Sequence, residues 1–190
     1  MYNPADYAGP DLTSKTGGLS ALARLYFDIA IWRRGPQDVP AVGILLPFTI
    51  AVYFLLNAAL AGLGIEPARA WLEQLVVDVG FTALWYWALL ALTRRRARYA
   101  QTVCAIFGYQ AVLTPLSGLA DFLVQRFGSD TVLQVPVYGV FFGLLLWTVI
   151  ATAHILRAAL ERPLSLCLAL SFAQLLAEEL LYYVLFGPGV

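Results

Sequence analysis

The sequence predicts an all-α protein: a polytopic membrane helix bundle with five transmembrane helices, preceded by an interfacial amphipathic helix. The first observation is composition, since 61% of the 190 residues are hydrophobic and 13% are charged, whereas soluble domains carry about 25% charged residues. The second is that five stretches have the roughly 20 apolar residues needed to cross about 30 Å of hydrocarbon. The third is that the breaks between these stretches are short, which leaves no room for a soluble domain.

The segment before the first span is predicted to have two parts. Residues 1–18 are polar and rich in Gly and Pro, which predicts a flexible cytoplasmic N-terminus. Residues 19–35 are predicted to form the interfacial helix, because apolar residues recur at steps of three and four, namely Leu22, Leu25, Ile29 and Trp32. Gly35 and Pro36 should end this helix. A cytoplasmic amphipathic helix, with or without a bound partner, is the alternative.

The transmembrane domain is predicted over residues 41–187. Its five spans are residues 41–64, 70–93, 99–122, 132–156 and 163–186. Cytoplasmic loops accumulate Lys and Arg, and ten of the twelve such residues fall on one side if the N-terminus lies inside. We therefore expect a cytoplasmic N-terminus and an outer C-terminus.

Polar residues follow one helical face in four of the spans, because residues three, four and seven apart lie on the same side of a helix. The faces are Thr49, Tyr53 and Asn57; Gln74, Asp78 and Thr82; Gln110, Thr114, Ser117 and Asp121; and Ser171, Gln174, Glu178 and Tyr182. Lipid cannot satisfy such groups, so each face should contact protein or water. The predicted orientation places the carboxyl groups in the outer half of the membrane.

These faces predict a polar seam or an ion or proton site built from Asn57, Asp78, Gln110, Asp121, Gln174 and Glu178. One interpretation is interhelical hydrogen bonding, worth roughly 0.6–2 kcal/mol per contact. The other is a proton or cation site, since ionisable residues inside spans mark ion and proton pathways. Glu179 points about 100° away from Glu178 on the helix. We therefore expect Glu179 to contact a partner.

The arginines on the predicted inner side are candidates for contacts with lipid phosphates. They are Arg33, Arg34, Arg94, Arg95, Arg96 and Arg98. The alternative is that they only reflect the positive charge bias of cytoplasmic loops. The formal net charge is zero, and no nucleic-acid partner is predicted.

The sequence does not predict an enzyme. Glu178 and Glu179 resemble the paired glutamates of intramembrane CAAX-processing and bacteriocin-processing peptidases, but Tyr183 stands where that motif has Arg, and His154 is the only histidine. One histidine and two distant cysteines cannot form the usual zinc, haem or iron–sulfur ligand sets. We expect no catalytic residues, no metal and no cofactor.

The third span contains QTVCAIFGYQAVLTP, in which Phe107, Gly108, Tyr109 and Pro115 are similar to a pattern of the Yip family (Ypt-interacting proteins). The order of parts, a cytoplasmic segment followed by five closely spaced spans, also resembles that family. The interval from Tyr109 to Pro115 is longer than the family pattern. The resemblance implies a non-enzymatic protein that acts by association, with Rab-type GTPases as partners of the eukaryotic members.

The stretch DIAIWRRGPQDVP is similar to proteobacterial inner-membrane proteins, so we expect a bacterial inner (cytoplasmic) membrane location. The predicted function is a scaffold or accessory subunit of a membrane assembly. Its expected partners are membrane lipids and other membrane protein subunits, or a second copy of the chain. The alternative is a small proton- or cation-coupled transporter or channel that uses the carboxylates of the outer half.

Overall fold

The computed structural model describes residues 15–62 and 71–187. They form the helices α1 (Lys15–Ala30), α2 (Leu45–Gly62), α3 (Trp71–Leu92), α4 (Tyr99–Phe127), α5 (Gln134–Leu160) and α6 (Leu164–Phe186), with short 3-10 turns η2 (Pro36–Asp38) and η3 (Arg96–Arg98). The described part contains no strand. Five of these helices, α2 to α6, are long and apolar enough to span a membrane. The predicted five-span, all-α class is confirmed, and the chain is a multi-pass membrane protein.

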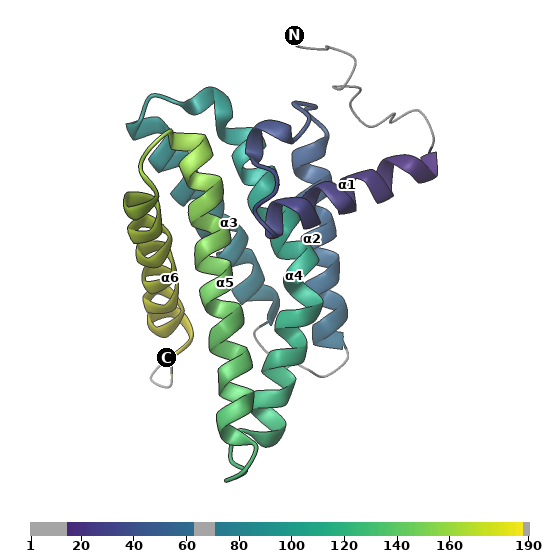
Figure 1. Ribbon diagram of the computed structural model, residues 1–190, viewed down its shortest axis with the longest axis vertical. Coiled ribbons are helices and arrows are strands. Elements are labelled where there is room, and N and C mark those ends of the chain that lie inside the picture. The colour runs from purple at the N-terminus through teal and green to yellow at the C-terminus, as the bar shows by residue number, and fades with distance from the viewer. Residues whose placement is uncertain (1–14, 63–70, 188–190) are drawn as a thin grey trace.

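Helix α4 lies at the centre of the bundle (Figure 1). It packs against α1, α2, α3 and α5, while α6 packs against α5 and α3. In the apolar 18-residue segment of the α4 span, 61% of the residues are buried within the protein. The corresponding share is only 17% in α2 and in α6. Helices α2 and α6 therefore present most of their apolar surface to lipid.

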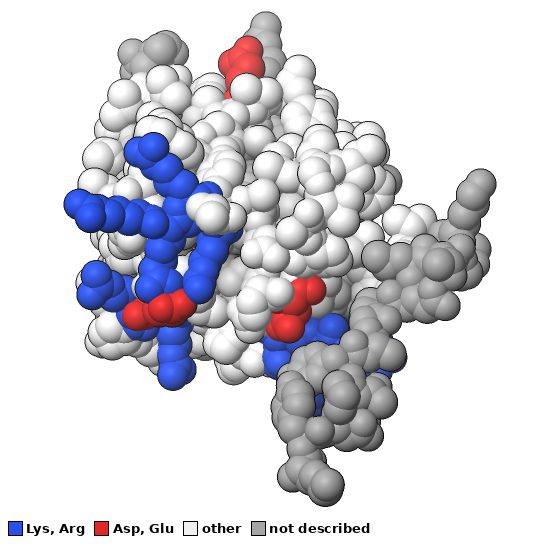
Figure 2. Space-filling view, turned by 90° about the horizontal axis from the view of Figure 1, so that it is seen from above, with Lys and Arg blue, Asp and Glu red and all other residues white. Residues whose placement is uncertain are grey.

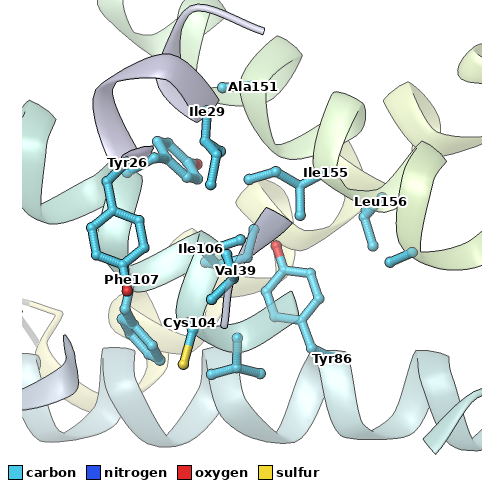
Figure 3. Close-up of a cluster of buried hydrophobic side chains, with 14 of the residues drawn as sticks. Tyr26, Ile29, Val39, Tyr86, Cys104, Ile106, Phe107, Ala151, Ile155 and Leu156 are labelled. Carbon is cyan, nitrogen blue, oxygen red and sulfur yellow. The ribbon is translucent and has the colours of Figure 1, made fainter. Parts of the chain in front are cut away.

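Helix α1 crosses α2 and α4 at a large angle to their axes and packs on the bundle (Figure 1). Its inward side chains Tyr26 and Ile29 point into the cluster that Figure 3 shows, where Phe107 and Ile155 also lie. The hydroxyls of Tyr26 and Thr49 share a hydrogen bond of 2.8 Å. Burial raises the pKa of Tyr26 to about 12. Helix α1 is therefore part of the core of the folded protein.

Close approach of α1 to α4 requires glycine at position 108. A Cβ built on Gly108 would overlap the ring of Tyr26. Gly143 of α5, in contrast, has open space where its Cβ would be. Gly108, one of the residues in the Yip-like pattern, therefore leaves the space that the Tyr26 ring occupies.

The predicted bounds of the first helix are wrong at both ends. The helix begins at Lys15, within the segment predicted to be flexible, while the rest of that segment, residues 1–14, lies outside the described residues. It ends at Ala30, five residues before Gly35. Trp32 has φ 63°, and the amide of Arg33 donates to the carbonyl of Asp28 at 2.8 Å. This is a Schellman ending, with Trp32 in the position that usually holds glycine.

A tertiary contact accounts for this early ending. The indole Nε1 of Trp147 in α5 donates to the carbonyl of Ala30 at 2.8 Å. The rings of Trp32 and Trp147 also lie 5.9 Å apart, centre to centre. The hydrogen bond satisfies one of the last backbone carbonyls of α1. Gly35 and Pro36 predicted a later end because the contact with Trp147 is not visible in the sequence.

One end of the bundle carries the α3–α4 and α5–α6 connections, residues 93–98 and 161–163, and is called the arginine-rich end here. Viewed onto this end, Figure 2 shows basic side chains around a small acidic patch. Glu161 pairs with Arg95 and with Arg98, each at 2.6 Å. Hydrogen bonds from these two arginines lower the pKa of Glu161 to about 2. The two connections are therefore joined by ion pairs.

Candidate functional site

A polar cavity of about 380 Å³ lies among α2, α3, α4 and α6, and is called the carboxyl cavity here. It is lined by Tyr53, Asn57, Trp71, Gln74, Leu75, Asp78, Gln110, Glu178 and Tyr182. Asp78 and Glu178 lie seven residues after the start of α3 and eight before the end of α6, or about 11 and 12 Å from those helix ends at 1.5 Å per residue. The two carboxyl groups thus meet at similar depth, near the end of the bundle opposite the arginine-rich end.

Asp78 accepts hydrogen bonds from α2 and from its own helix. The hydroxyl of Tyr53 donates to Asp78 Oδ2 at 2.7 Å, and the hydroxyl of Thr82 donates to Oδ1 at 3.4 Å. The Glu178 carboxyl of α6 lines the same cavity. Two carboxylates that share a site repel each other unless one of them carries a proton. The arrangement is one in which two carboxyl groups can share a proton.

A second cavity, of about 190 Å³, adjoins the carboxyl cavity. Tyr53, Asn57 and Gln110 line both, and the second is also lined by Ser117 and Asp121. Gln110 Oε1 is buried and has no hydrogen-bond partner within the described residues. A polar space of this size can hold water that would donate to it.

Gln174 belongs to a different polar group, which we call the tyrosine cluster: Tyr86, Tyr109, Thr152 and Gln174. The hydroxyl of Tyr86 donates to Gln174 Oε1 at 2.6 Å. The hydroxyls of Tyr109 and Thr152 share a hydrogen bond of 2.5 Å. All four side chains are buried, and they come from α3, α4, α5 and α6. The cluster closes the bundle on the arginine-rich side of the carboxyl pair.

The structure thus divides the six predicted seam residues into three groups. Asn57, Asp78, Gln110 and Glu178 line the carboxyl cavity, Asp121 lines the adjoining one, and Gln174 is in the tyrosine cluster. Tyr86 was missed, although it follows Asp78 and Thr82 at steps of four and so shares their face. Nothing in the sequence pairs Tyr109 with Thr152, because they lie on different helices.

The two adjacent glutamates face different surroundings. Glu178 is half-buried at the cavity, whereas Glu179 is exposed on the outside of α6. This agrees with the separation of about 100° expected between neighbours on a helix. The expected partner contact of Glu179 stays a prediction.

Several predicted lipid-contacting arginines already contact protein. Arg98 donates to the carbonyls of Ala158 and Ala159, at 3.0 and 3.2 Å, in addition to pairing with Glu161. Arg34 pairs with Asp28 at 3.5 Å, and the Arg96 guanidinium lies 5.6 Å from the Trp87 ring centre. Contacts of Arg33, Arg94 and the others with lipid phosphates stay a prediction.

Metal-ligand groups are sparse. Residues 15–62 and 71–187 contain no group of three or more His, Cys, Asp or Glu that could hold a metal ion. Cys104 and Cys167 are both buried and unpaired with each other. The polar side chains that line the carboxyl cavity carry carboxyl, hydroxyl, amide and indole groups.

Comparison with known proteins gives no match to a family model, a curated protein or a solved structure. The resemblance of the third span to the Yip family therefore stays a prediction. The function must be argued from the site itself.

Proposed function

We propose that this protein is a small membrane proton carrier in which the Asp78–Glu178 pair binds and releases the transported proton. The observation that carries this proposal is that carboxyl groups from two different helices line one polar cavity of a membrane helix bundle. Carboxyl groups inside membranes are costly and mark ion or proton pathways. The scaffold function expected from the sequence has no comparable support from geometry.

The surroundings of the pair suit a proton better than a metal ion. Both oxygens of Asp78 already accept hydrogen bonds, from Tyr53 and Thr82. A calcium-like cation needs six to eight oxygen ligands with free lone pairs. A single proton shared by the pair instead leaves one negative charge, which these two hydroxyls stabilise.

Release of the shared proton would change the interaction between α3 and α6. Without that proton, two adjacent carboxylates would repel each other. Asp78 belongs to α3 and Glu178 to α6, so repulsion favours a conformation in which these helices separate. Proton binding and the α3–α6 contact are therefore coupled in this proposal.

The proposed orientation places the arginine-rich end in the cytoplasm and the carboxyl pair in the outer half of a bacterial inner membrane. It is supported by the distribution of basic residues, because ten of the twelve fall on the same side of the membrane as the N-terminus. Protons would then reach the pair from the outside.

Proton flux into liposomes that contain the purified protein tests the proposal. A pH-sensitive dye inside the liposomes should report flux for the wild type after an acid jump outside. Asp78→Asn and Glu178→Gln should reduce it to the level of empty liposomes. Glu73→Gln and Glu179→Gln are matched controls on the same helices, since both residues are exposed. Wild-type flux in the pair variants would refute the proposal, as would a wild type without flux.

A second candidate function is the scaffold or accessory subunit. The observation that favours it is Glu179, an exposed carboxyl within a membrane helix. Native mass spectrometry of protein extracted gently from its own membrane distinguishes the two functions. A stoichiometric partner subunit without proton flux would support this second function, whereas flux without such a subunit would support the first.

A further inference from the structure

Helix α6 carries a continuous exposed stripe on the side that faces away from the bundle. We define the α6 stripe as Ser165, Ala169, Phe172, Leu176, Glu179 and Tyr183, all of which are exposed. The buried residues Cys167, Ser171 and Gln174 lie on the opposite side of the same helix. No contact within the described chain accounts for the stripe.

The spacing along the α6 stripe is four, three, four, three, four. This alternation keeps residues on one seam when two helices cross at about 20°, as in left-handed helix pairs. Most transmembrane bundles use crossings of this kind. The stripe extends over nearly the whole of α6, so the seam can run the full length of the span.

The chemistry of the stripe changes along its length. Ser165 and Ala169 are small, which allows two helix backbones to approach closely. Glu179 and Tyr183 are polar, and neither side chain makes a hydrogen bond or an ion pair within residues 15–62 and 71–187. A carboxyl group facing lipid is costly and needs a donor. The outer part of the stripe therefore calls for a partner in the membrane.

Tyr183 can supply that donor from another copy of the chain. Side chains on a helix lean toward its N-terminus, so the Tyr183 hydroxyl reaches back toward the level of Glu179, one turn earlier. In a parallel pair of identical helices, residues of equal number lie at equal depth. The Tyr183 hydroxyl of each copy is then near the level of the other copy's Glu179, and the small residues face each other.

We propose that two copies of this protein pair in parallel through their α6 stripes, with a two-fold axis along the membrane normal. Tyr183 of each copy donates to Glu179 of the other. The stripe is self-complementary, with small residues against small and donor against acceptor, as a two-fold interface requires. The pairing uses the side of α6 opposite the carboxyl cavity and does not depend on the proposed proton site.

Cysteine cross-linking in the membrane tests the pairing. The variants are Ala169→Cys and Leu176→Cys on the stripe, in a chain whose buried Cys104 and Cys167 are replaced by alanine. Leu166→Cys and Ala173→Cys are controls, since these positions are also exposed but lie about 80–100° away around the helix. Cross-linked dimers should form at the two stripe positions and not at the controls. Equal yields at all four positions, or no dimer at any, would overturn the pairing.

The polar contact is tested by counting copies in liposomes through single-molecule photobleaching. Tyr183→Phe removes only the donor and should lower the dimer fraction several-fold, while Tyr138→Phe, exposed on α5, should not. Glu179→Gln should keep the dimer, because the amide oxygen still accepts. A dimer fraction in Tyr183→Phe equal to that of the wild type would overturn the assigned contact.

Discussion

The two halves of the bundle treat their polar groups differently. Near the arginine-rich end, the tyrosine cluster pairs buried groups from four helices with each other, and α1 packs on α4 and shares a hydrogen bond with α2. In the opposite half, polar groups line two cavities, and Gln110 Oε1 has no protein partner in the described chain. The tyrosine cluster is closed by protein, whereas the carboxyl half leaves room for water or protons.

The contrast indicates which half stabilises the protein and which supports its chemistry. Gln174 and Glu178 lie one turn apart on α6, yet Gln174 is in the closed cluster and Glu178 faces a cavity. Satisfied buried networks stabilise a fold, whereas groups left for a ligand do not. Changes in the closed half should therefore cost stability, and changes in the open half should cost proton binding.

The largest effect is expected at Gly108. Gly108→Ala places a methyl group against the Tyr26 ring, and overpacking of this kind costs about 3 kcal/mol at the upper end of its range. Equilibrium unfolding in detergent measures the loss, and faster proteolysis of α1 should accompany it. Gly143→Ala is the control, because its Cβ has open space and alanine favours helix. Equal stability of the two variants would contradict the docking of α1.

The next effect is expected in the tyrosine cluster. Gln174→Leu leaves the buried Tyr86 hydroxyl without its acceptor, which costs about 2 kcal/mol. Adding Tyr86→Phe removes the orphaned hydroxyl and should recover most of the loss, because both partners of the bond are then apolar. A double-mutant cycle of unfolding free energies checks this, and strict additivity would show that the bond contributes nothing.

A smaller effect on stability is expected in the open half. Asp78→Asn should change the unfolding free energy by less than about 1 kcal/mol, since the amide still accepts from Tyr53 and polar contacts in membranes are weak on average. The same variant should lose proton flux. Unfolding and flux measured on one preparation give the comparison. If Asp78→Asn lost as much stability as Gln174→Leu, the carboxyl half would stabilise the fold as much as the tyrosine cluster does, and the proposed difference between the halves would be wrong.

The smallest effect is expected for the ion pairs of the exposed Glu161. Arg95 and Arg98 lower its pKa from 4.5 to about 2. A depressed pKa contributes stability that is present above the ordinary value and lost as the pH falls through the folded value. The difference in Tm between the wild type and Glu161→Gln should be present at pH 7, shrink from about pH 4.5 to 2, and decrease with added salt. A difference that grows toward pH 2 would contradict the pairing.

Periodicity alone predicted the regular part of this protein. It placed five spans close to the observed helices, grouped polar residues of four spans on one face each, and separated Glu178 from Glu179. These features depend on residues a few positions apart in one helix, and the geometry of a single helix fixes them.

Tertiary structure decided which faces meet. Only the packing of α3 against α6 brings Asp78 and Glu178 to one cavity and gives Gln174 its partner Tyr86. Only the packing of α4 against α5 gives Tyr109 its partner Thr152. Trp147 accounts for the early end of α1, and Glu161 binds Arg95 and Arg98, although both partners are distant in sequence. Such contacts depend on how helices far apart in the chain pack together, which the periodicity of one helix does not record.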